Sequence, residues 1–500
     1  MLNMLQQLAI HANAQPDKPA IESSNLSLDY QTLYDHVLQT MERLSKLNID
    51  SLALDLDNGA AWAIIDLASM AADISTVPIP PFFSPDQVCH ALSDTAVSCV
   101  ITDAPKRFIE KAAGITLTET ATFELCGKTL YYLQTHHKTN KIPKGIHKVT
   151  YTSGTTAEPK GVLLSWKQME PVITSLAKAV AVKQNDRHVV LMPLAVLLEN
   201  MAGLYLPLWC GASVALPSLI ETGLLGAAGL ESERMVETLE HYAATTAIFS
   251  PQMLQGMVEH ISTTGITPPS LRFIALGGAA VSKRLLQSAK QLGIPVFEGY
   301  GLSESASVAT LNHPGAQRIG SVGKPLPHLQ LCIAKDGEVL VRGNSFLGYL
   351  NDTEPRNEND WWHTGDIGRL DDEGFLYLLG RRRNIFITAF GRNVSPEWVE
   401  RELILEPVII QAALFGEARP WNLALIVPSL CASQQEIETA IQRTNQNLPD
   451  YARIGQWLMA DAPFNLVNGQ LSGTGRLRRQ TIYQHYCSRI EAQYQQELIS

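Results

Sequence analysis

Lysine is missing from the last third of this chain. None follows Lys335 in a sequence of 500 residues, although arginine recurs as far as Arg489. A permanent cation needed by a site in this region must therefore be an arginine. Basic residues are also sparse elsewhere, because the formal net charge is −10 and the only run of three is Arg381-Arg382-Arg383. A nucleic-acid-binding protein, which requires a basic stripe, is excluded.

Paired cysteines are absent as well. The seven cysteines form no C-x-x-C pair and are an odd, scattered set. This usage predicts reduced thiols in a cytoplasmic protein and argues against a structural zinc site.

No signal peptide is predicted, because the N-terminus has neither a basic region nor a long apolar core. Residues 201–220 carry no charge and are long enough to span a membrane. Two prolines and two glycines interrupt this stretch, at Gly203, Pro207, Gly211 and Pro217. Proline breaks a helix, so we expect a buried helix, a turn and a strand here, and no transmembrane segment.

Short apolar runs alternate with helical patterns over most of the chain, which predicts an α/β fold with mostly parallel, buried strands. Strands are expected at 51–56, 98–102, 188–192, 247–250, 272–276 and 295–297. Helices are expected at 87–92, 167–181, 232–241 and 282–292.

The pattern changes after residue 329. A hairpin is predicted around Asp336-Gly337, and a further short strand at 374–378. The last hundred or so residues mix strands and helices and have the size of a small domain. We predict two domains, residues 1–382 and 383–500.

The segment from Tyr151 to Gly161, YTSGTTAEPKG, predicts a phosphate-binding loop. Its glycine permits a tight turn, successive backbone N–H groups can bind an anion, and a lysine adds a cation. The spacing differs from that of P-loop NTPases. Taken alone, such a loop could equally be an ordinary surface turn. The candidate residues are Thr152, Ser153, Gly154, Thr155, Thr156 and Lys160.

This loop resembles the signature of the adenylate-forming superfamily, which includes acyl-CoA synthetases, luciferases and peptide-synthetase adenylation domains. Ala157 stands where the family usually has glycine. Four further segments resemble family motifs in the same order, namely GGAAVS at 277–282, FEGYGLSES at 297–305, HTGDIG at 363–368 and GRRRNIFITAFGRNVSPEWVE at 380–400. The resemblance covers nearly the whole chain and is closest to medium- and long-chain fatty acyl-CoA synthetases.

The resemblance implies a fold and a set of binding residues. The fold is a large N-terminal region of two α/β sheets plus a distorted β-barrel, which binds ATP and the acid, and a small mobile α+β C-terminal domain. Tyr300 stacks on adenine, Asp366 binds the ribose hydroxyls, Arg381 binds ribose or phosphate, and Arg383 is the hinge residue. The nucleotide-binding set adds Gly277, Gly278, Ala279, Glu298, Gly299, Gly301 and Ser303. Alone, the arginine run would be interpreted as a solvated charge cluster.

The implied reaction joins a carboxylic acid to AMP, releases pyrophosphate, and then passes the acyl group to a thiol. Mg²⁺ is expected on Glu304, because this ion prefers hard oxygen ligands. The family places a lysine of the C-terminal domain at the reacting phosphate, and here that position holds Arg476. The catalytic set is thus Arg476, Lys160, Glu304 and Thr155. If arginine does not replace lysine, the chain is instead a non-catalytic nucleotide- or acyl-binding homologue.

The acid is predicted to bind at 192–200 and near the nucleotide, through Val196, Leu197, Gly278 and Leu302. No aspartate is present in 192–200 to pair with an amino group, and an unpaired ammonium would be costly to bury, so an amino acid is not expected. A fatty acid is the predicted substrate, with Glu199 roughly in register with a family glutamate. These side chains could equally be simple core residues.

Coenzyme A is the predicted acceptor, and a separate acyl carrier protein is the alternative. A luciferase-like oxygenase is a more distant one. No carrier-attachment segment follows Arg479, so any carrier is a separate chain. The expected cofactors are ATP, Mg²⁺ and coenzyme A as co-substrate, and the oligomeric state stays open.

Overall fold

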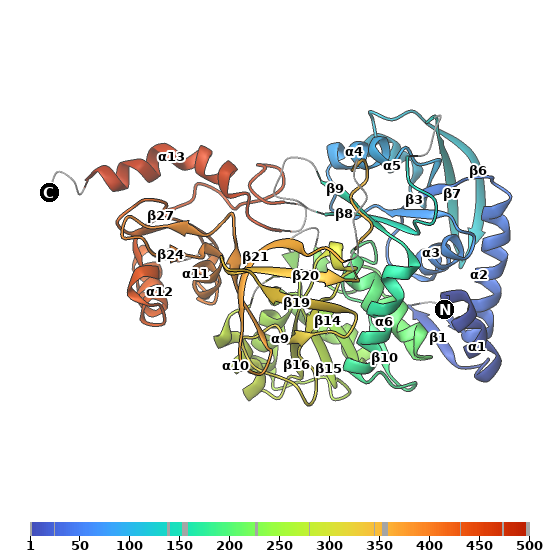
Figure 1. The fold of residues 1–500 in the computed structure, drawn as a ribbon, viewed down its shortest axis with the longest axis horizontal. Coiled ribbons are helices and arrows are strands. Elements are labelled where there is room, and N and C mark those ends of the chain that lie inside the picture. The colour runs from blue at the N-terminus through green and yellow to red at the C-terminus, as the bar shows by residue number, and fades with distance from the viewer. Residues whose placement is uncertain are drawn as a thin grey trace.

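Two large sheets, one of nine strands and one of seven, form the N-terminal part of the described chain (Figure 1). The structure is a computed structural model. It describes residues 3–24, 26–137, 141–152, 159–225, 229–279, 281–344, 346–352, 359–430, 432–472 and 475–496. Figure 1 shows α1 and α2 at one end of the molecule and α12 and α13 at the other, with β19 to β21 between them.

The nine-stranded sheet carries most of the predicted strands. Its six central neighbours, from β16 to β1, run parallel, while β2, β17 and β18 are antiparallel at the edges. In spatial order the strands are β18 (Lys324–Pro325), β17 (Thr310–Leu311), β16 (Val296–Tyr300), β15 (Phe273–Leu276), β14 (Thr246–Phe249), β10 (Arg187–Val189), β11 (Ser213–Ala215), β1 (Pro19–Ser23) and β2 (Leu26–Asp29).

The seven-stranded sheet ends in the hairpin that flanks the predicted phosphate loop. Its order is β6 (Leu117–Leu125), β7 (Lys128–Thr135), β5 (Cys99–Thr102), β3 (Ser51–Asp55), β4 (Ser75–Pro78), β8 (Lys148–Thr152) and β9 (Lys160–Leu164). Strand β3 is buried along its whole length. A strand buried on both faces contains a continuous apolar run, which is why the sequence predicted it.

Helices cover both sheets, and the largest apolar core joins residues of the two sheets with α2, α3, α6 and η1. The N-terminal helices are α1 (Met4–Ala14), α2 (Tyr30–Ser45), α3 (Ala60–Ala71), α4 (Pro85–Thr95), α5 (Pro105–Lys111), α6 (Trp166–Val180), the π-helix η1 (Glu199–Tyr205), α7 (Leu206–Trp209), α8 (Ser232–His241), α9 (Pro251–Thr264), α10 (Lys283–Gln291) and the short 3₁₀-helix η2 (Ser303–Ser305). A small hairpin, β12 (Leu224–Leu225) with β13 (Gly229–Leu230), precedes α8.

The uncharged stretch 201–220 is the buried helix, turn and strand that its sequence predicted. It contains most of η1, then α7, a turn with Gly211 at φ +74°, and β11. Within the described residues we find no helix whose length and hydropathy suit a bilayer crossing.

A buried ion pair fastens η1 to the seven-stranded sheet. Lys148 Nζ on β8 lies 2.7 Å from Asp66 Oδ1 on α3, and both side chains are almost completely buried. Two side chains of η1 also bind this carboxylate, Tyr205 through its hydroxyl at 2.5 Å and Asn200 through its amide at 3.1 Å. Lys148 precedes the phosphate loop, so one polar cluster fixes both that loop's strand and η1.

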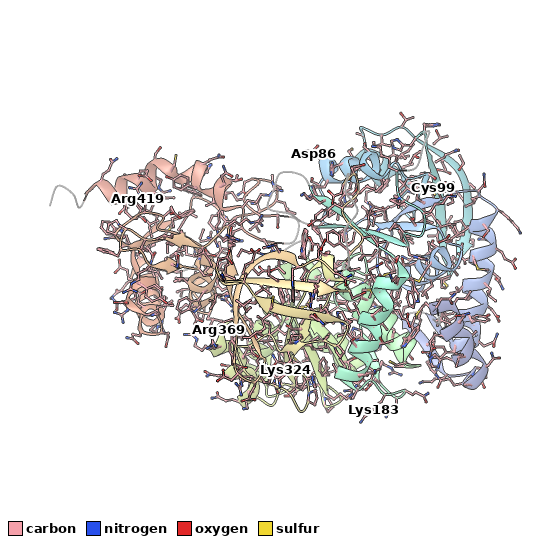
Figure 2. All side chains as sticks on the ribbon, viewed as in Figure 1. Asp86, Cys99, Lys183, Lys324, Arg369 and Arg419 are labelled. Carbon is pink, nitrogen blue, oxygen red and sulfur yellow. The ribbon has the colours of Figure 1, made fainter. Side chains whose placement is uncertain are left out.

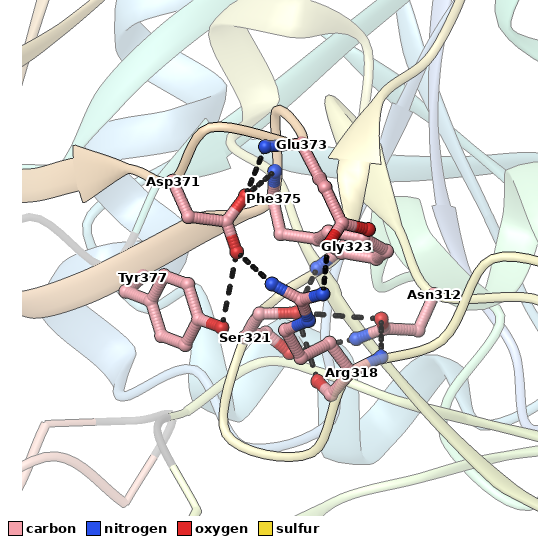
Figure 3. A network of polar contacts seen from close by, with 8 residues as sticks. All are labelled: Asn312, Arg318, Ser321, Gly323, Asp371, Glu373, Phe375 and Tyr377. Atoms are coloured by element: carbon pink, nitrogen blue, oxygen red, sulfur yellow. Dashed lines mark hydrogen bonds and ion pairs between the residues drawn. The ribbon is translucent and has the colours of Figure 1, made fainter.

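A four-stranded antiparallel sheet occupies the place expected for the barrel. Its strands are β19 (Leu329–Ile333), β20 (Glu338–Gly343), β21 (Trp362–Leu370) and β22 (Leu376–Arg381). Figure 3 shows what fastens it to the nine-stranded sheet: Arg318, between β17 and β18, binds Asp371 at 2.6 Å and Glu373 at 2.5 Å in the β21–β22 turn. This contact ties the turn before β22 to the segment between β17 and β18.

The C-terminal part has its own core. It contains β23 (Phe386–Ile387), β24 (Asn393–Val394), α11 (Pro396–Leu403), β25 (Ile409–Phe415), β26 (Asn422–Pro428), α12 (Gln434–Gln446), the short 3₁₀-helix η3 (Asp450–Ala452), β27 (Ile454–Met459) and α13 (Arg479–Gln496). Its two apolar clusters contain residues of 386–454 and 413–494. The α/β fold class with a small α+β C-terminal domain is confirmed.

The described cysteines are all free thiols. Cys99, labelled in Figure 2, is fully buried in β5, and burial raises the pKa of its thiol to about 12. Such a group is unreactive at neutral pH.

Candidate active site

A tyrosine, a carboxylate and a guanidinium meet where β16 approaches the four-stranded sheet. Tyr300 donates its hydroxyl to Asp366 Oδ2 at 2.7 Å, and Arg381 Nε lies 2.9 Å from Asp366 Oδ1. Asp366 on β21 and Arg381 on β22 are cross-strand partners, so the sheet itself aligns them. Arg381 is fixed further by a bond from Nη1 to the carbonyl of Thr364 at 3.1 Å.

Burial disfavours the ionised form of the Asp366 carboxyl group. Asp366 is 6% exposed, and burial raises its pKa, although the Arg381 guanidinium and the Tyr300 hydroxyl oppose the rise. The pKa of Tyr300 is raised well above its usual value by burial and by the neighbouring carboxylate. The tyrosine is therefore a permanent donor, and the carboxylate an acceptor that gains from further donors such as hydroxyls.

The three consecutive arginines have different environments. Arg381 and Arg383 line the central cavity, whereas Arg382 turns away and pairs with Asp336 at 3.0 Å and Glu338 at 2.7 Å. Burial and the Arg381 charge lower the pKa of Arg383. Two of the three arginines thus line one cavity, and the third is paired with two carboxylates, although Arg382 and Arg383 stay exposed to solvent.

A second cluster marks the end of the β8–β9 hairpin. Thr152 and Lys160 are cross-strand partners at its open end, on either side of the phosphate loop. The Lys160 ammonium lies 4.8 Å from the centre of the Tyr349 ring, and the Tyr349 hydroxyl donates to Glu304 Oε1 at 2.7 Å. Cation and carboxylate are thus placed on either side of one tyrosine.

Glycines let the backbone approach this space. A Cβ on Gly301 would lie 1.7 Å from the Ser307 carbonyl oxygen, so no side chain fits there. Gly278, just after β15, has φ +82°. Both residues follow the carboxyl ends of parallel strands, which is where open α/β sheets bind ligands.

Arg476 reaches the same space from the C-terminal part. Ser472 binds its backbone, since the Ser472 hydroxyl accepts the Arg476 N–H at 3.1 Å. Its Nη2 donates to the carbonyl of Gly278 at 3.1 Å. Burial and the Arg381 guanidinium lower the pKa of Arg476, yet an arginine stays charged.

One cavity of about 480 Å³ connects these groups with an apolar channel. The channel runs between the nine-stranded sheet and the helices α6 and η1. Ile248 and Ala275 line its sheet side, and Leu176, Leu197 and Ala202 its helix side. Asn58 fixes the segment leading into η1, because its amide binds the carbonyl of Met192 at 3.0 Å and the N–H of Leu194 at 2.8 Å.

Most of the predicted site residues line this cavity. They are Thr152, Lys160, Val196, Leu197, Gly277, Gly278, Gly299, Tyr300, Gly301, Leu302, Ser303, Glu304, Arg381 and Arg476. Asp366 is not a lining residue itself, but it binds Tyr300 and Arg381, which are. Ala279 and Glu298 are not among its lining residues, and the Glu298 carboxylate instead accepts the N–H of Gly320 at 3.1 Å. Ser153, Gly154, Thr155 and Thr156 lie outside the described residues.

Sequence reasoning missed several residues of the site. Tyr349, which orients Glu304, carries no motif signal. His188 and Thr246 line the channel far from the nucleotide end, and the histidine at the start of the predicted buried strand 188–192 was a signal that could have been used. Asp186 lines it too, but Arg272 binds both of its oxygens.

Comparison with known proteins identifies the family. The sequence model of the AMP-binding enzyme family matches residues 8–350, and that of the AMP-binding enzyme C-terminal domain matches residues 384–498. This chain belongs to the AMP-binding enzyme family. The predicted superfamily is confirmed, and so is the prediction of an AMP-forming acid–thiol ligase.

Two kinds of relative match equally well. A 2-succinylbenzoate–CoA ligase from Bacillus mycoides is 28% identical over 465 residues, covering 87% of this chain and 90% of its own. The long-chain-fatty-acid–CoA ligase FadD15 from Mycobacterium bovis is 27% identical over 523 residues, covering 87% and 86%. These identities do not decide between the two acids.

The fold is similar to that of solved ligases. An o-succinylbenzoate coenzyme A synthetase from Bacillus subtilis, in complex with ATP and a magnesium ion, has a TM-score of 0.75 at 23% identity, over 95% of this chain and 98% of its own. At the level of the family, the predicted use of ATP, Mg²⁺ and coenzyme A is confirmed.

Proposed function

We propose that this chain activates a carboxylic acid as its acyl-AMP and then transfers the acyl group to coenzyme A. The observation that carries the proposal is that one cavity contains both the residues expected to bind the nucleotide and an apolar channel that continues from them. An acid bound in the channel places its carboxylate beside the cations Lys160, Arg381 and Arg476.

Different residues are proposed to bind the adenine, the ribose and Mg²⁺, according to their positions in the cavity. The Tyr300 ring and the Gly277–Gly278 backbone form a slot for the adenine, with Asp366 and Arg381 at its ribose side. Glu304 supplies oxygen ligands to Mg²⁺, which, when bound, neutralises charge on the phosphates. A carboxylate oxygen then bonds to the α-phosphorus, and the bond from that phosphorus to the pyrophosphate oxygen breaks.

Arg476 is proposed to take the place of a lysine in this step. Two anions must approach each other, so catalysis rests on positioning and on positive charge held in place beforehand. A guanidinium can bridge a carboxylate and a phosphate with two parallel donors. The bond from Arg476 to Gly278 already places that charge at the end of β15.

The acid is proposed to be of moderate size. The channel lies between the nine-stranded sheet and the helices α6 and η1, and its volume is only part of about 480 Å³. This favours an aromatic acid such as 2-succinylbenzoate, named for one relative, over a long-chain fatty acid, named for another. No free carboxylate among the described lining residues of the channel is placed to bind an amino group, since Asp186 is bound by Arg272.

ATP–pyrophosphate exchange tests the first half of the proposal. The purified chain is incubated with 2-succinylbenzoate, straight-chain acids from hexanoate to palmitate, and amino acids. AMP release is then measured with coenzyme A or with an acyl carrier protein. Exchange with an organic acid and AMP release with coenzyme A are expected. Absence of exchange with every acid would reject the function, and AMP release only with carrier protein would reject the acceptor.

The predicted cytoplasmic location is part of this proposal. Free cysteines dispersed over the described chain support it, and fractionation of the source cells tests it.

A further inference from the structure

The end of the channel remote from the nucleotide is polar. His188 on β10, Thr246 on β14 and Phe273 on β15 are direct cross-strand neighbours, so they form one row across the sheet. All three line the cavity, and His188 and Thr246 are only 4% and 7% exposed. Two residues further along their strands lie Ile248 and Ala275. The channel therefore has an apolar wall and a polar end.

The position of this row sets the distance that an acid must span to reach the polar groups. Gly277, at the nucleotide end, lies four residues after Phe273 and directly follows the end of β15. At a rise of about 3.3 Å per strand residue, the row lies about 13 Å from Gly277. An acyl chain of medium length, or an aromatic acid, spans this distance. Its far end then meets His188 and Thr246.

The polar end is held in place by a buried carboxyl group. His188 Nδ1 lies 2.9 Å from Thr246 Oγ1, and His188 Nε2 lies 3.4 Å from Glu199 Oε1 on η1. Glu199 is fully buried, and burial raises its pKa. Its Oε2 has no hydrogen-bond partner among the described residues. The side chains of His188, Thr246 and Glu199 are thus kept inside the core although the hydrogen-bonding capacity of Glu199 is not fully used.

A glycine makes the arrangement possible. A Cβ on Gly203 would lie 2.7 Å from Glu199 Oε1 and 2.9 Å from His188 Nε2. Because this position of η1 has no side chain, the helix packs directly over the histidine–glutamate pair. The sequence thus provides room for the pair instead of filling the space with an apolar residue.

An alkyl end group would be a poor occupant of this space. It would cover the Thr246 hydroxyl without using the hydrogen-bonding capacity that this hydroxyl retains beyond its bond to His188. The nearby Asp186 offers no alternative contact, because Arg272 binds both of its oxygens. An oxygen atom on the ligand would satisfy Thr246, which can both donate and accept.

We propose that Thr246, positioned by His188, selects the acid by hydrogen bonding through its hydroxyl to an oxygen at the end of the acyl group remote from the reacting carboxylate. This inference rests on the proposed function and specifies its substrate class. The oxygen belongs to a hydroxyl, a carbonyl or a second carboxylate. A site built to bind such a group rejects an analogue without it far more strongly than an apolar pocket rejects an added methylene.

The test compares matched acids in ATP–pyrophosphate exchange. Each straight-chain acid from hexanoate to dodecanoate is paired with its ω-hydroxy and ω-carboxy derivatives. A second comparison pairs 2-succinylbenzoate with the analogue that lacks the aromatic carboxylate. We expect kcat/KM to be at least about tenfold higher for an oxygenated member than for its partner. The three types of derivative distinguish the hydroxyl, the second alkyl carboxylate and the aromatic carboxylate.

Three variants assign the effect to residues. Thr246→Val keeps the shape and removes the hydroxyl, and we expect it to lower the preference ratio about tenfold. His188→Leu should lower the ratio as well, whereas His188→Gln, which retains hydrogen-bonding groups, should restore part of it. The control is Thr135→Val, another buried strand threonine, which bonds the Val97 carbonyl away from the cavity. Its ratio should not change.

The outcomes separate the two proposals. Robust exchange with equal kcat/KM for oxygenated and plain acids overturns this inference and leaves the proposed function standing. A ratio that survives both Thr246→Val and His188→Leu also overturns it. No exchange with any acid overturns both. A merely structural role would lower thermal stability and affect all acids alike, so the ratio is the deciding measurement.

Discussion

Arg476 of the C-terminal part donates a hydrogen bond to the carbonyl of Gly278 in the N-terminal part, with 3.1 Å between Nη2 and the oxygen. The bond joins a residue near the end of the chain to the loop after β15. It places a permanent cation where the carboxylate and the α-phosphate are proposed to meet. No lysine occurs in the C-terminal part that could supply this charge instead.

Replacing Arg476 by alanine should therefore impair adenylation. We expect pyrophosphate exchange to fall by about a hundredfold to a thousandfold, the usual effect of removing one fixed donor to a developing charge. Arg476→Lys should retain more activity than Arg476→Ala. Thioester formation from supplied acyl-AMP should change little, because no pyrophosphate leaves in that step. The exposed Arg478→Ala is the control, and unchanged exchange in Arg476→Ala would contradict the assignment.

Two further contacts join the two parts of the molecule. Arg284 on α10 lies 3.1 Å from Glu406 Oε1, just after α11, and Arg401 on α11 donates to the carbonyl of Val281 at 2.9 Å. These contacts stabilise the arrangement that brings Arg476 to Gly278. If the C-terminal domain rotates for thioester formation, as the family resemblance implies, they must break.

Arg284→Ala should weaken adenylation selectively. A partly exposed ion pair contributes about 0.2–1 kcal/mol, so pyrophosphate exchange should fall by up to about fivefold. Thioester formation from acyl-AMP should be unchanged or faster. Arg489→Ala is the matched control, since Arg489 pairs with Asp461 at 2.7 Å within the C-terminal part. Equal loss of both half-reactions would argue against a role in domain position.

The buried pair of Asp66 and Lys148 should dominate the stability of the N-terminal part. Asp66→Asn leaves a buried ammonium without its counter-ion, which costs about 3–5 kcal/mol. We expect a large drop in the urea midpoint. Asp103→Asn breaks the partly exposed pair with Lys128, which lies at 3.1 Å, and should cost less than about 1 kcal/mol. Similar midpoints for the two variants would contradict this reading.

The sheets could be predicted from the sequence because buried parallel strands consist of continuous runs of apolar residues. Strands β3, β5, β14 and β15 agree with the prediction within one residue at each end, and helix α8 agrees at both ends. Strand β10 ends at Val189 although the apolar run continues to Met192. An apolar run indicates burial, and buried segments need not stay paired in a sheet.

The candidate site could be predicted only where motifs are contiguous. Tyr300, Asp366 and Arg381 belong to separate motifs, and their hydrogen bonds depend on how β16 meets β21 and β22. The pairing of His188 with Thr246 in the polar row could not be predicted for the same reason. His188 and Thr246 are 58 residues apart in sequence, and only the pairing of β10 with β14 makes them neighbours.

Glu298 gives the stability a predictable pH dependence. It is 9% exposed on β16, and burial raises its pKa from 4.5 to about 8, although Arg401 and Lys283 oppose the rise. The folded chain therefore keeps this proton up to about pH 8, while the unfolded chain loses it near pH 4.5. Between these values folding takes up a proton, so stability is greatest at the acid end and decreases as the pH rises.

Glu298→Gln mimics the protonated carboxyl and should remove this decrease. One pKa unit corresponds to about 1.4 kcal/mol, so the wild type should lose on the order of 2–4 kcal/mol more than the variant across the interval. Urea midpoints measured between about pH 4.5 and pH 8 give the two slopes. The exposed Glu259→Gln should keep the slope of the wild type. If Glu298→Gln also keeps the slope of the wild type, the Glu298 carboxyl ionises at the same pH in the folded and unfolded chains. Its burial on β16 then has no effect on the pH dependence of stability.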